Sequence, residues 1–266
     1  TPLLSSAASD VYKRQGYYSF RHIPEEYRHM LPKGRYSHTS DIADFEPLKG
    51  KRCLIIGGRQ SAFEWAGLMS RYTDNIDVVY RHDTPDFKPS DWSWANPYIE
   101  KTQHHPGWFK ELAEEEKEKI NKRFWKEGRL ELEDWLLKRL DGSKITLRPN
   151  TTVVNCAPSS SGSLEIILSD ENHLDIDHVI LATGYQVDIR KIPFLSGSNI
   201  MDELECDNGY PILDDGLQSS LPGLYFTGIH AVNDFGPFLF FVAGSFAAAE
   251  IIAGKIGTST QTGTDS

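Results

Sequence analysis

Residues 53–62 read CLIIGGRQSA, and this stretch decides the fold. Its first five residues form a short apolar run that ends in glycine, which is typical of a strand buried in a parallel sheet. Apolar residues then recur at helical spacing over residues 60–71, and residues 76–80 (IDVVY) alternate as a β-branched strand does. A strand, a glycine turn, a helix and a second strand within about 30 residues predict one βαβ unit.

Further segments extend this pattern along the chain. Short strands are predicted at five more places: residues 145–147, 152–154, 164–168, 179–182 and 224–227. The charged stretch at residues 110–140 predicts two amphipathic helices that break near Gly128. Residues 83–107 are rich in Pro, Trp and Asp without a clean period, which favours a loop. Together these segments predict an α/β fold with a predominantly parallel sheet.

One apolar run, residues 235–249, requires a test as a membrane span. It is shorter than the ~20 residues that cross a bilayer, and it contains Pro237 and Gly244. We therefore expect a buried helix that begins at Pro237, and no membrane span.

Composition excludes several classes of function. The 266 residues carry 28 basic and 38 acidic side chains, a net charge of -10, which argues against a nucleic-acid surface and favours a cytoplasmic enzyme. The three cysteines are scattered, so neither a disulfide framework nor a Cys-x-x-Cys redox pair is expected. The adjacent His104 and His105 have no third ligand in view, so no metal site is predicted.

The glycine turn carries the strongest chemical signal. A dinucleotide-binding turn needs glycine where the chain bends and a small residue where helix meets strand, so that the helix amino terminus faces a pyrophosphate. Gly57 and Ala62 fill the outer positions of Gly-x-Gly-x-x-Ala, and Arg59 replaces the middle glycine with Gly58 beside it. The candidate site residues of this turn are Gly57, Gly58, Arg59, Gln60, Ser61 and Ala62.

The end of the second strand indicates which dinucleotide would bind. An NAD site presents an acidic residue to the ribose about 24 residues past the first glycine, and here Arg81 stands at that place. A cation there suits a 2′-phosphate, so NADP is favoured over NAD. The alternative is a solvated arginine at a strand end. Arg59 is a candidate second phosphate ligand.

Two other segments are candidate ligand sites. Thr183 and Gly184 lie in ATGY (182–185), where small residues permit close approach of a ligand, although a simple strand exit explains them equally well. Residues 224–237 (LYFTGIHAVNDFGP) end a strand at Gly228 and open a helix at Pro237. A capped core helix is the alternative there. Trp92 and Trp94 could line a substrate pocket, but core packing is the more common role.

In this order, GGRQSA, ATGY and LYFTGI…DFGP resemble the flavoproteins with two dinucleotide-binding domains, above all the flavin-containing and Baeyer–Villiger-type monooxygenases. Residues 34–38 (GRYSH) also resemble the Gly-x-x-x-His element of the monooxygenase signature. The aromatic residues that flank this element in the family are replaced by Pro32 and Ile42.

The resemblance implies Rossmann-like parallel sheets and a division of the chain into segments. Residues 50–176 would form the NAD(P)H-binding domain, and residues 177–256 the carboxy-terminal part of an FAD-binding domain. Residues 16–49 would be a connecting segment from the FAD domain. Residues 1–15 would be a non-native leader, and residues 257–266 a disordered tail. The first Gly-x-Gly-x-x-Gly of the family is missing, so the chain is expected to be an amino-terminally truncated fragment.

The resemblance also implies an activity and a set of binding residues. NADPH would pass hydride to FAD, and oxygen would reach a small organic substrate. NADPH would be held by residues 57–62 and Arg81, and Thr183 and Gly184 would lie near the dinucleotides. The flavin would be bordered by Gly228, Asp234, Gly236, Pro237 and Phe238. No side chain is assigned a catalytic role. The alternatives are a non-catalytic NADP(H)-sensing module and a flavin reductase that acts on a partner without oxygenation.

Overall fold

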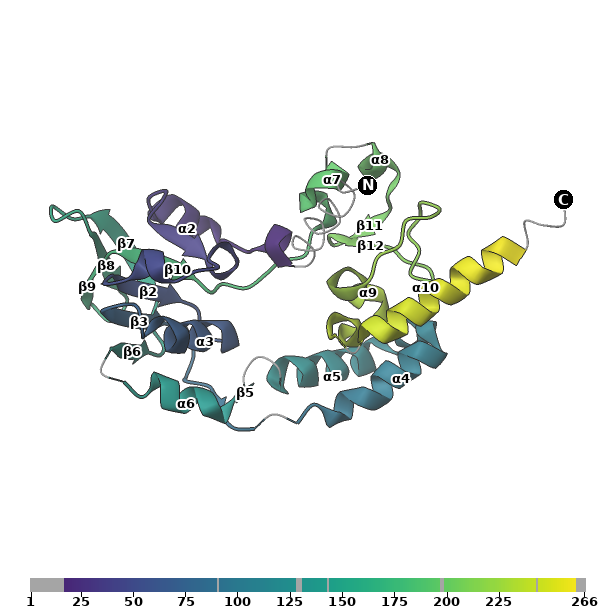
Figure 1. Ribbon diagram of the computed structural model, residues 1–266, viewed down its shortest axis with the longest axis horizontal. Helices are drawn as coiled ribbons and strands as arrows, with labels where there is room; N and C mark the ends of the chain where they lie inside the picture. The colour runs from purple at the N-terminus through teal and green to yellow at the C-terminus, as the bar shows by residue number, and fades with distance from the viewer. Residues whose placement is uncertain are drawn as a thin grey trace. The chain divides into compact units, whose positions relative to one another are not determined.

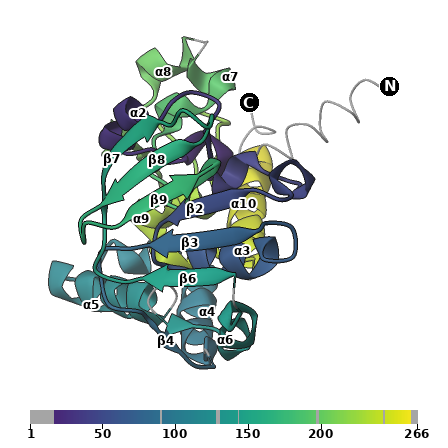
Figure 2. The same cartoon turned by 90° about the vertical axis from the view of Figure 1, so that its left-hand side faces the viewer.

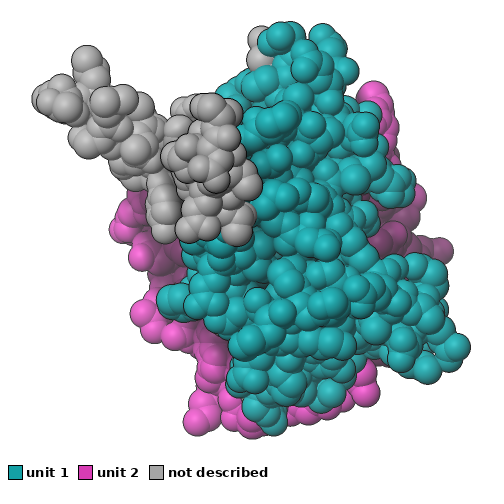
Figure 3. Space-filling model, turned by 90° about the vertical axis from the view of Figure 1, so that its right-hand side faces the viewer, with its two compact units in different colours: residues 1–20, 91–124, 186–266 teal, residues 21–90, 125–185 magenta. Residues whose placement is uncertain are grey.

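The computed structural model describes residues 17–89, 91–127, 131–142, 144–196, 199–242 and 244–261 (Figure 1). By their contacts, the described residues divide into two compact units, coloured separately in Figure 3. Unit 1 holds residues 17–20, 91–124 and 186–261, and unit 2 holds residues 21–89 and 125–185. Each unit is therefore built from segments that are distant in the sequence.

Unit 2 is organised around a five-stranded parallel sheet. Its strand order is β1-β10-β2-β3-β6, with these bounds: β1 Tyr36–His38, β10 His178–Leu181, β2 Arg52–Ile56, β3 Asn75–Val79 and β6 Ile145–Arg148. The helix α3 (Gln60–Met69) connects β2 to β3 and completes the βαβ unit that the sequence predicts. The α/β class and the parallel sheet are confirmed.

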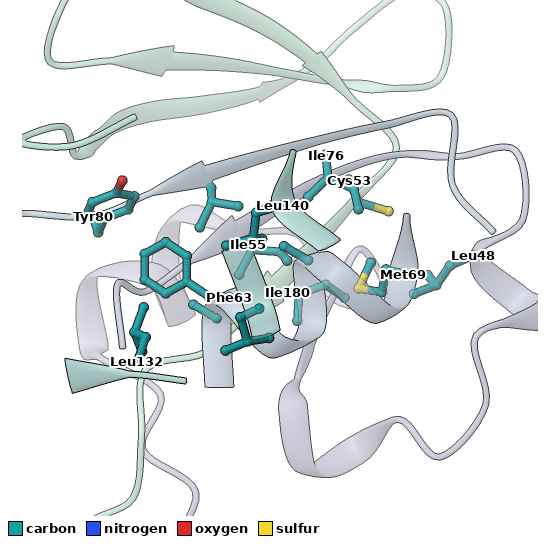
Figure 4. Close-up of a cluster of buried hydrophobic side chains, with 14 residues drawn as sticks. Leu48, Cys53, Ile55, Phe63, Met69, Ile76, Tyr80, Leu132, Leu140 and Ile180 are labelled. Atoms are coloured by element: carbon teal, nitrogen blue, oxygen red, sulfur yellow. The ribbon is translucent and has the colours of Figure 1, made fainter. Parts of the chain in front are cut away.

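Alternation along the strands sorts the side chains onto the two faces of this sheet. In β2, Cys53 and Ile55 face a core that α3 covers with Ala62, Phe63, Ala66 and Met69. The helix α6 (Asp134–Leu140) packs on the same side, next to α3. Figure 4 shows this cluster, with Phe63 of α3 close to Ile55 of the sheet.

The other face of the sheet is covered by a second, antiparallel sheet. Leu54 and Ile56 point into this second core, which is closed by a three-stranded meander and by the short helix α2 (Figure 2). The bounds are β7 Val153–Pro158, β8 Leu164–Leu168, β9 His173–Ile176 and α2 Glu25–Met30. The strands predicted at 152–154 and 164–168 thus exist, but they pair with each other and not with the parallel sheet.

Unit 1 is mainly helical, with two hydrophobic cores. Its helices are α4 Asn96–His104, α5 Glu114–Trp125, α7 Pro193–Ser196, α8 Ile200–Glu203, α9 Val232–Phe235 and α10 Gly244–Gln261. The last residue of α5, Trp125, is grouped with unit 2. Unit 1 also contains a two-stranded ladder of β11 (Cys206–Asp207) and β12 (Tyr210–Pro211). In unit 2, a second ladder joins β4 (Asp86–Phe87) to β5 (Glu131–Leu132).

Short 3-10 turns connect these elements: Tyr17–Phe20, Thr39–Asp41, Glu46–Leu48, Ser93–Ala95, Pro106–Phe109, Ile189–Lys191, Gly228–Ala231 and Pro237–Phe240.

Three predictions about individual segments are wrong. Residues 83–107 are not all loop, because α4 forms where Tyr98 and Ile99 pack into an aromatic core. Residues 224–227 form no strand beyond an isolated bridge from Tyr225 to Gln218, since their backbone bonds go to the irregular segment at Leu217–Ser219. The apolar run from Pro237 forms a 3-10 turn, and α10 begins only at Gly244.

The predicted chain ends and domain bounds differ in part from the observed grouping of residues. The predicted leader (1–15) lies outside the described residues, whereas residues 257–261 of the predicted tail continue α10. Residues 21–49 and 177–185 group with residues 50–89 because β1 and β10 hydrogen-bond into the sheet beside β2. The assignment of segments to NADPH and FAD domains stays a prediction. No helix in the described parts of the chain is both long and apolar enough to cross a membrane.

Candidate functional site

Gly57 and Gly58 form a turn that only glycine can occupy. Gly57 has a φ of 143°, and a Cβ placed on it would lie 2.4 Å from the carbonyl oxygen of Ala182, at the end of the neighbouring strand β10. A Cβ on Gly58 would lie 2.3 Å from the Cβ of Tyr80, at the end of β3. The turn is therefore pressed between the ends of both neighbouring strands, at the carboxyl edge of the sheet.

The helix α3 begins directly behind this turn with an uncapped end. Arg59 occupies the N-cap position, and its side chain makes no capping hydrogen bond. The N–H of Ala62 donates to the carbonyl of Arg59 at 2.9 Å, and the amide of Gln60 donates to Glu64 at 2.8 Å and not back to the helix start. The first N–H groups and the positive end of the helix dipole thus face outward, as in helices that bind anions.

Two arginines lie at this edge. The guanidinium of Arg59 is 4.9 Å from the ring centre of Trp125, a cation–π contact that the sequence did not suggest, because no local pattern links the two residues. Arg81 is exposed and lies two residues past the end of β3. The parallel sheet therefore brings residues 57–62 and Arg81 to one edge, and their roles toward a dinucleotide stay predictions.

Thr183 and Gly184 follow β10 at the same edge, where they are held by the chain around His22. The hydroxyl of Thr183 donates to the carbonyl of His22, and the N–H of His22 donates to the carbonyl of Gly184 at 2.9 Å. Gly184 has a φ of 81°, and a Cβ there would meet nothing within 4 Å. The space beside Gly184 is open, whereas the hydroxyl of Thr183 is used in a hydrogen bond that supports the fold.

His38, from the Gly-x-x-x-His element, is part of the same structure. Its side chain is fully buried, with Nε2 3.0 Å from the carbonyl oxygen of Gly184 and Nδ1 2.8 Å from the hydroxyl of Ser40. Burial lowers the pKa of His38 below its usual value. Sequence reasoning named the element but not its contact with Gly184, which only the pairing of β1 with β10 creates.

The remaining predicted residues lie in unit 1, where most of them have structural roles. Asp234 accepts a hydrogen bond from the N–H of Leu213 at 2.8 Å and lies 4.0 Å from the ammonium of Lys110. Phe238 is fully buried and stacks on Tyr98 with ring centres 4.8 Å apart. These two side chains support the core of unit 1, and their roles toward a flavin stay predictions.

The glycines of this segment differ from each other. Gly236 ends α9 with a φ of 79°, and a Cβ there would meet the ring of Phe109 at 2.8 Å, so packing requires glycine. Pro237 then starts the next 3-10 turn and is buried. Gly228 has a φ of 65° and open space around it.

The two tryptophans of the segment 91–97 lie in the aromatic core of unit 1. Trp92 and Trp94 stack on each other at 5.9 Å, and Trp94 packs edge-on against Phe238 at 5.6 Å. Core packing is thus the role that the structure gives them. Within the described ranges, no three His, Cys, Asp or Glu residues lie where they could hold a metal ion.

Comparisons with known proteins agree with this architecture. Two family models, both described as pyridine nucleotide-disulphide oxidoreductase, match residues 8–127 and 119–236. A ferredoxin–NADP reductase of Sulfurisphaera tokodaii is 25% identical over 226 residues, which cover 82% of this chain and 51% of the relative. The chain resembles these oxidoreductases along most of its length and spans about half of the curated relative.

Solved structures share the fold at low identity. An ornithine hydroxylase from Pseudomonas aeruginosa aligns with a TM-score of 0.63 and 19% identity, covering 88% of this chain and 59% of that one. An ornithine N-hydroxylase from Kutzneria sp. 744, solved with reduced FAD, NADP+ and L-ornithine, aligns with a TM-score of 0.57 and 14% identity, covering 86% and 60%. These likenesses show a common fold.

Proposed function

We propose that this chain is part of an NADPH- and FAD-dependent oxidoreductase, and that unit 2 binds the NADPH. The observation that carries the proposal is the uncapped start of α3 behind Gly57, at the carboxyl edge of a parallel sheet. Ligands of open α/β sheets bind at this edge, and a bare helix start is suited to a pyrophosphate. The residues present therefore fit a dinucleotide.

Each residue of the edge has a role in this proposal. The N–H groups at the start of α3 bind the pyrophosphate, and Gly57 keeps the turn close to the neighbouring strands so that the helix end is exposed. Arg81 binds the 2′-phosphate that distinguishes NADPH from NADH. Arg59, placed over Trp125, supplies a second positive charge beside the pyrophosphate.

The proposed FAD cofactor is supported by the related proteins. A reductase and N-hydroxylating monooxygenases share the fold or the sequence pattern, and FAD, when bound, accepts hydride from NADPH. In unit 1 the open position at Gly228 is compatible with a nearby ligand, whereas Asp234 and Phe238 are engaged in the core.

The finer activity that we favour is oxygenation of a small organic substrate by a flavin monooxygenase. It is supported by the shared fold of the ornithine hydroxylases and by the GRYSH element around His38. A reductase that passes electrons to a partner is the second candidate, supported by the ferredoxin–NADP reductase relative. Incorporation of labelled oxygen into product distinguishes the two, and NADPH binding without any turnover would instead favour a sensor.

The binding proposal is tested with Arg81→Ala. Loss of one charge-assisted contact to the 2′-phosphate costs about 1.5–3 kcal/mol, so NADP+ affinity should fall roughly ten- to hundredfold while NAD+ affinity changes little. Isothermal titration with both nucleotides measures this difference. Arg71→Ala, which removes an exposed arginine just past α3, is the matched control and should leave both affinities unchanged. Equal losses for NADP+ and NAD+ in Arg81→Ala would contradict the phosphate role.

A further inference from the structure

A pocket lies at the opposite, amino-terminal edge of the sheet in unit 2. Its volume is about 540 Å³, and its lining comes from the residues just before β1, β2 and β10, from the first residue of β10 and from the turn between β7 and β8. Lys51 precedes β2 and Gly57 follows it, so the whole length of this strand separates the pocket from the nucleotide edge. For five residues that length is roughly 16 Å.

Three glycines keep this pocket open. Gly34, Gly50 and Gly162 have φ values of 80°, 69° and 84°, and a Cβ on any of them would meet nothing within 4 Å. Three separate segments therefore turn sharply at the pocket, and the three glycine positions themselves leave its volume free of side chains. The volume is in the range of pockets that bind small molecules.

The charged groups that line the pocket leave it with an excess of positive charge. Arg35 and Lys51 both line it, and the carboxylate that does so is Asp177. Asp177 is paired with Arg52, whose Nε and Nη2 lie 3.0 and 2.8 Å from its oxygens. Asp175, which lies in β9, is bound to the same guanidinium.

The guanidinium of Arg35 has a donor without a hydrogen-bond partner in the described part of the chain. Its Nη2 donates to the carbonyl of Gly162 at 2.7 Å, and its Nε is buried without a hydrogen-bond partner in the described part of the chain. A guanidinium offers five N–H donors, and buried donors without partners are rare in folded proteins. Because Nε is enclosed by the protein, an anion in the pocket would be bound by the terminal nitrogens of Arg35.

The pKa of His178 is sensitive to the positive charges of this pocket. Its Nε2 lies 2.9 Å from the hydroxyl of Ser37. Burial, followed by the charges of Lys51 and Arg35, lowers the pKa of His178 to about 4. The imidazole is therefore neutral at pH 7, and it becomes easier to protonate if an anion offsets the two cations.

We propose that this pocket binds the phosphate group of a small phosphate monoester, with Arg35 and Lys51 as its cationic ligands. Arg35 supplies a planar fork that matches phosphate oxygens, and Lys51 supplies a compact charge. The volume exceeds that of the phosphate alone, so the organic part of a monoester also has room. The site is separate from the nucleotide edge and is independent of the proposed NADPH site.

Titration calorimetry at pH 7.5 tests the proposal with inorganic phosphate and with ribose 5-phosphate, against ribose alone. We expect saturable binding of both phosphates and none of ribose, and Lys51→Ala should weaken phosphate binding about tenfold or more. Lys49→Ala is the matched control, because Lys49 is exposed and pairs only loosely with Glu46 at 3.8 Å.

An NMR titration of His178 gives a second readout that does not depend on a variant. Saturating phosphate should raise the pKa of His178 from about 4, because the bound phosphate, a monoanion at that pH, offsets part of the charge of Lys51 and Arg35 while Arg52, Asp175 and Asp177 stay paired. An unchanged pKa of His178 at saturation would overturn the proposal. So would binding that is lost equally in Lys49→Ala and Lys51→Ala, or that is lost in Arg59→Ala, which would place the anion at α3.

Discussion

At the scale of single residues, Gly57 shows how a motif and its physical cause can differ. The sequence motif explains this glycine by a tight turn and by the approach of a ligand. The structure adds a stronger reason, since a Cβ would lie 2.4 Å from the carbonyl oxygen of Ala182, on a strand far away in the sequence. The residue type was therefore predictable from the motif, whereas its main contact was not.

This contact predicts a large effect of Gly57→Ala on stability. Backbone strain at a φ of 143° and overlap with Ala182 should together cost roughly 2–4 kcal/mol of the free energy of unfolding. Urea denaturation measures this loss. Gly142→Ala is the control, because a Cβ on Gly142 meets open space, and it should change stability by at most about 0.5 kcal/mol. Similar losses in both variants would show that the approach to Ala182 is not what requires glycine.

At the scale of elements, the buried strands were predictable and the polar residues within them were not. Residues 76–80 alternate as a strand, yet Asp77 in the middle of β3 is buried. Its carboxylate accepts from the Nε of Arg148 in β6 at 2.7 Å and from Asn75 at 2.8 Å. The ion pair can be recognised only once β3 and β6 are known to be neighbours.

We predict that Asp77→Ala strongly destabilises the chain. Removing one partner of a buried ion pair costs about 3–5 kcal/mol, and the partial exposure of Arg148 should reduce this loss to about 2–4 kcal/mol. Lys119→Ala, which removes the exposed pair with Glu115 on α5, serves as the comparison and should cost less than about 0.5 kcal/mol. Denaturation midpoints of the two variants decide the matter, and equal midpoints would refute a special role for the β3–β6 pair.

The errors at this scale have a common origin. Helix α4 has few apolar residues, so its periodicity is weak, and it is ordered by contacts of Tyr98 with Trp108 and Phe238. Residues 224–227 have the composition of a strand but find no regular partner, because Leu217 opposite them has a left-handed backbone with a φ of 64°. In both cases distant residues override the local pattern.

At the scale of the whole molecule, the chain passes between its two units several times. Residues 91–124 interrupt unit 2 in the sequence and belong to unit 1. The β4–β5 ladder, with Asp86 opposite Glu131, joins the segments on either side of this interruption. Unit 2 also has its own hydrophobic cores on both faces of its sheet.

We therefore predict that unit 2 folds without residues 91–124. A chain of residues 21–90 and 125–185, joined by about ten Gly and Ser residues to span the parallel β4–β5 ladder, should unfold cooperatively and retain NADP+ binding. Circular dichroism during heating and titration with NADP+ measure these properties. A chain that lacks a cooperative transition would show that the unit depends on the rest of the protein.

The sequence by itself determined the α/β class, the βαβ unit and the glycine turn that begins α3. These features depend on side-chain periodicity and on glycine within short stretches, so they can be inferred from neighbouring residues alone. The tertiary structure alone decided which strands are neighbours, that residues 91–124 join unit 1, and that Arg35, Lys51 and His178 meet at one pocket. Such groupings depend on which distant segments bury their apolar faces together, and this cannot be inferred from the pattern of neighbouring residues.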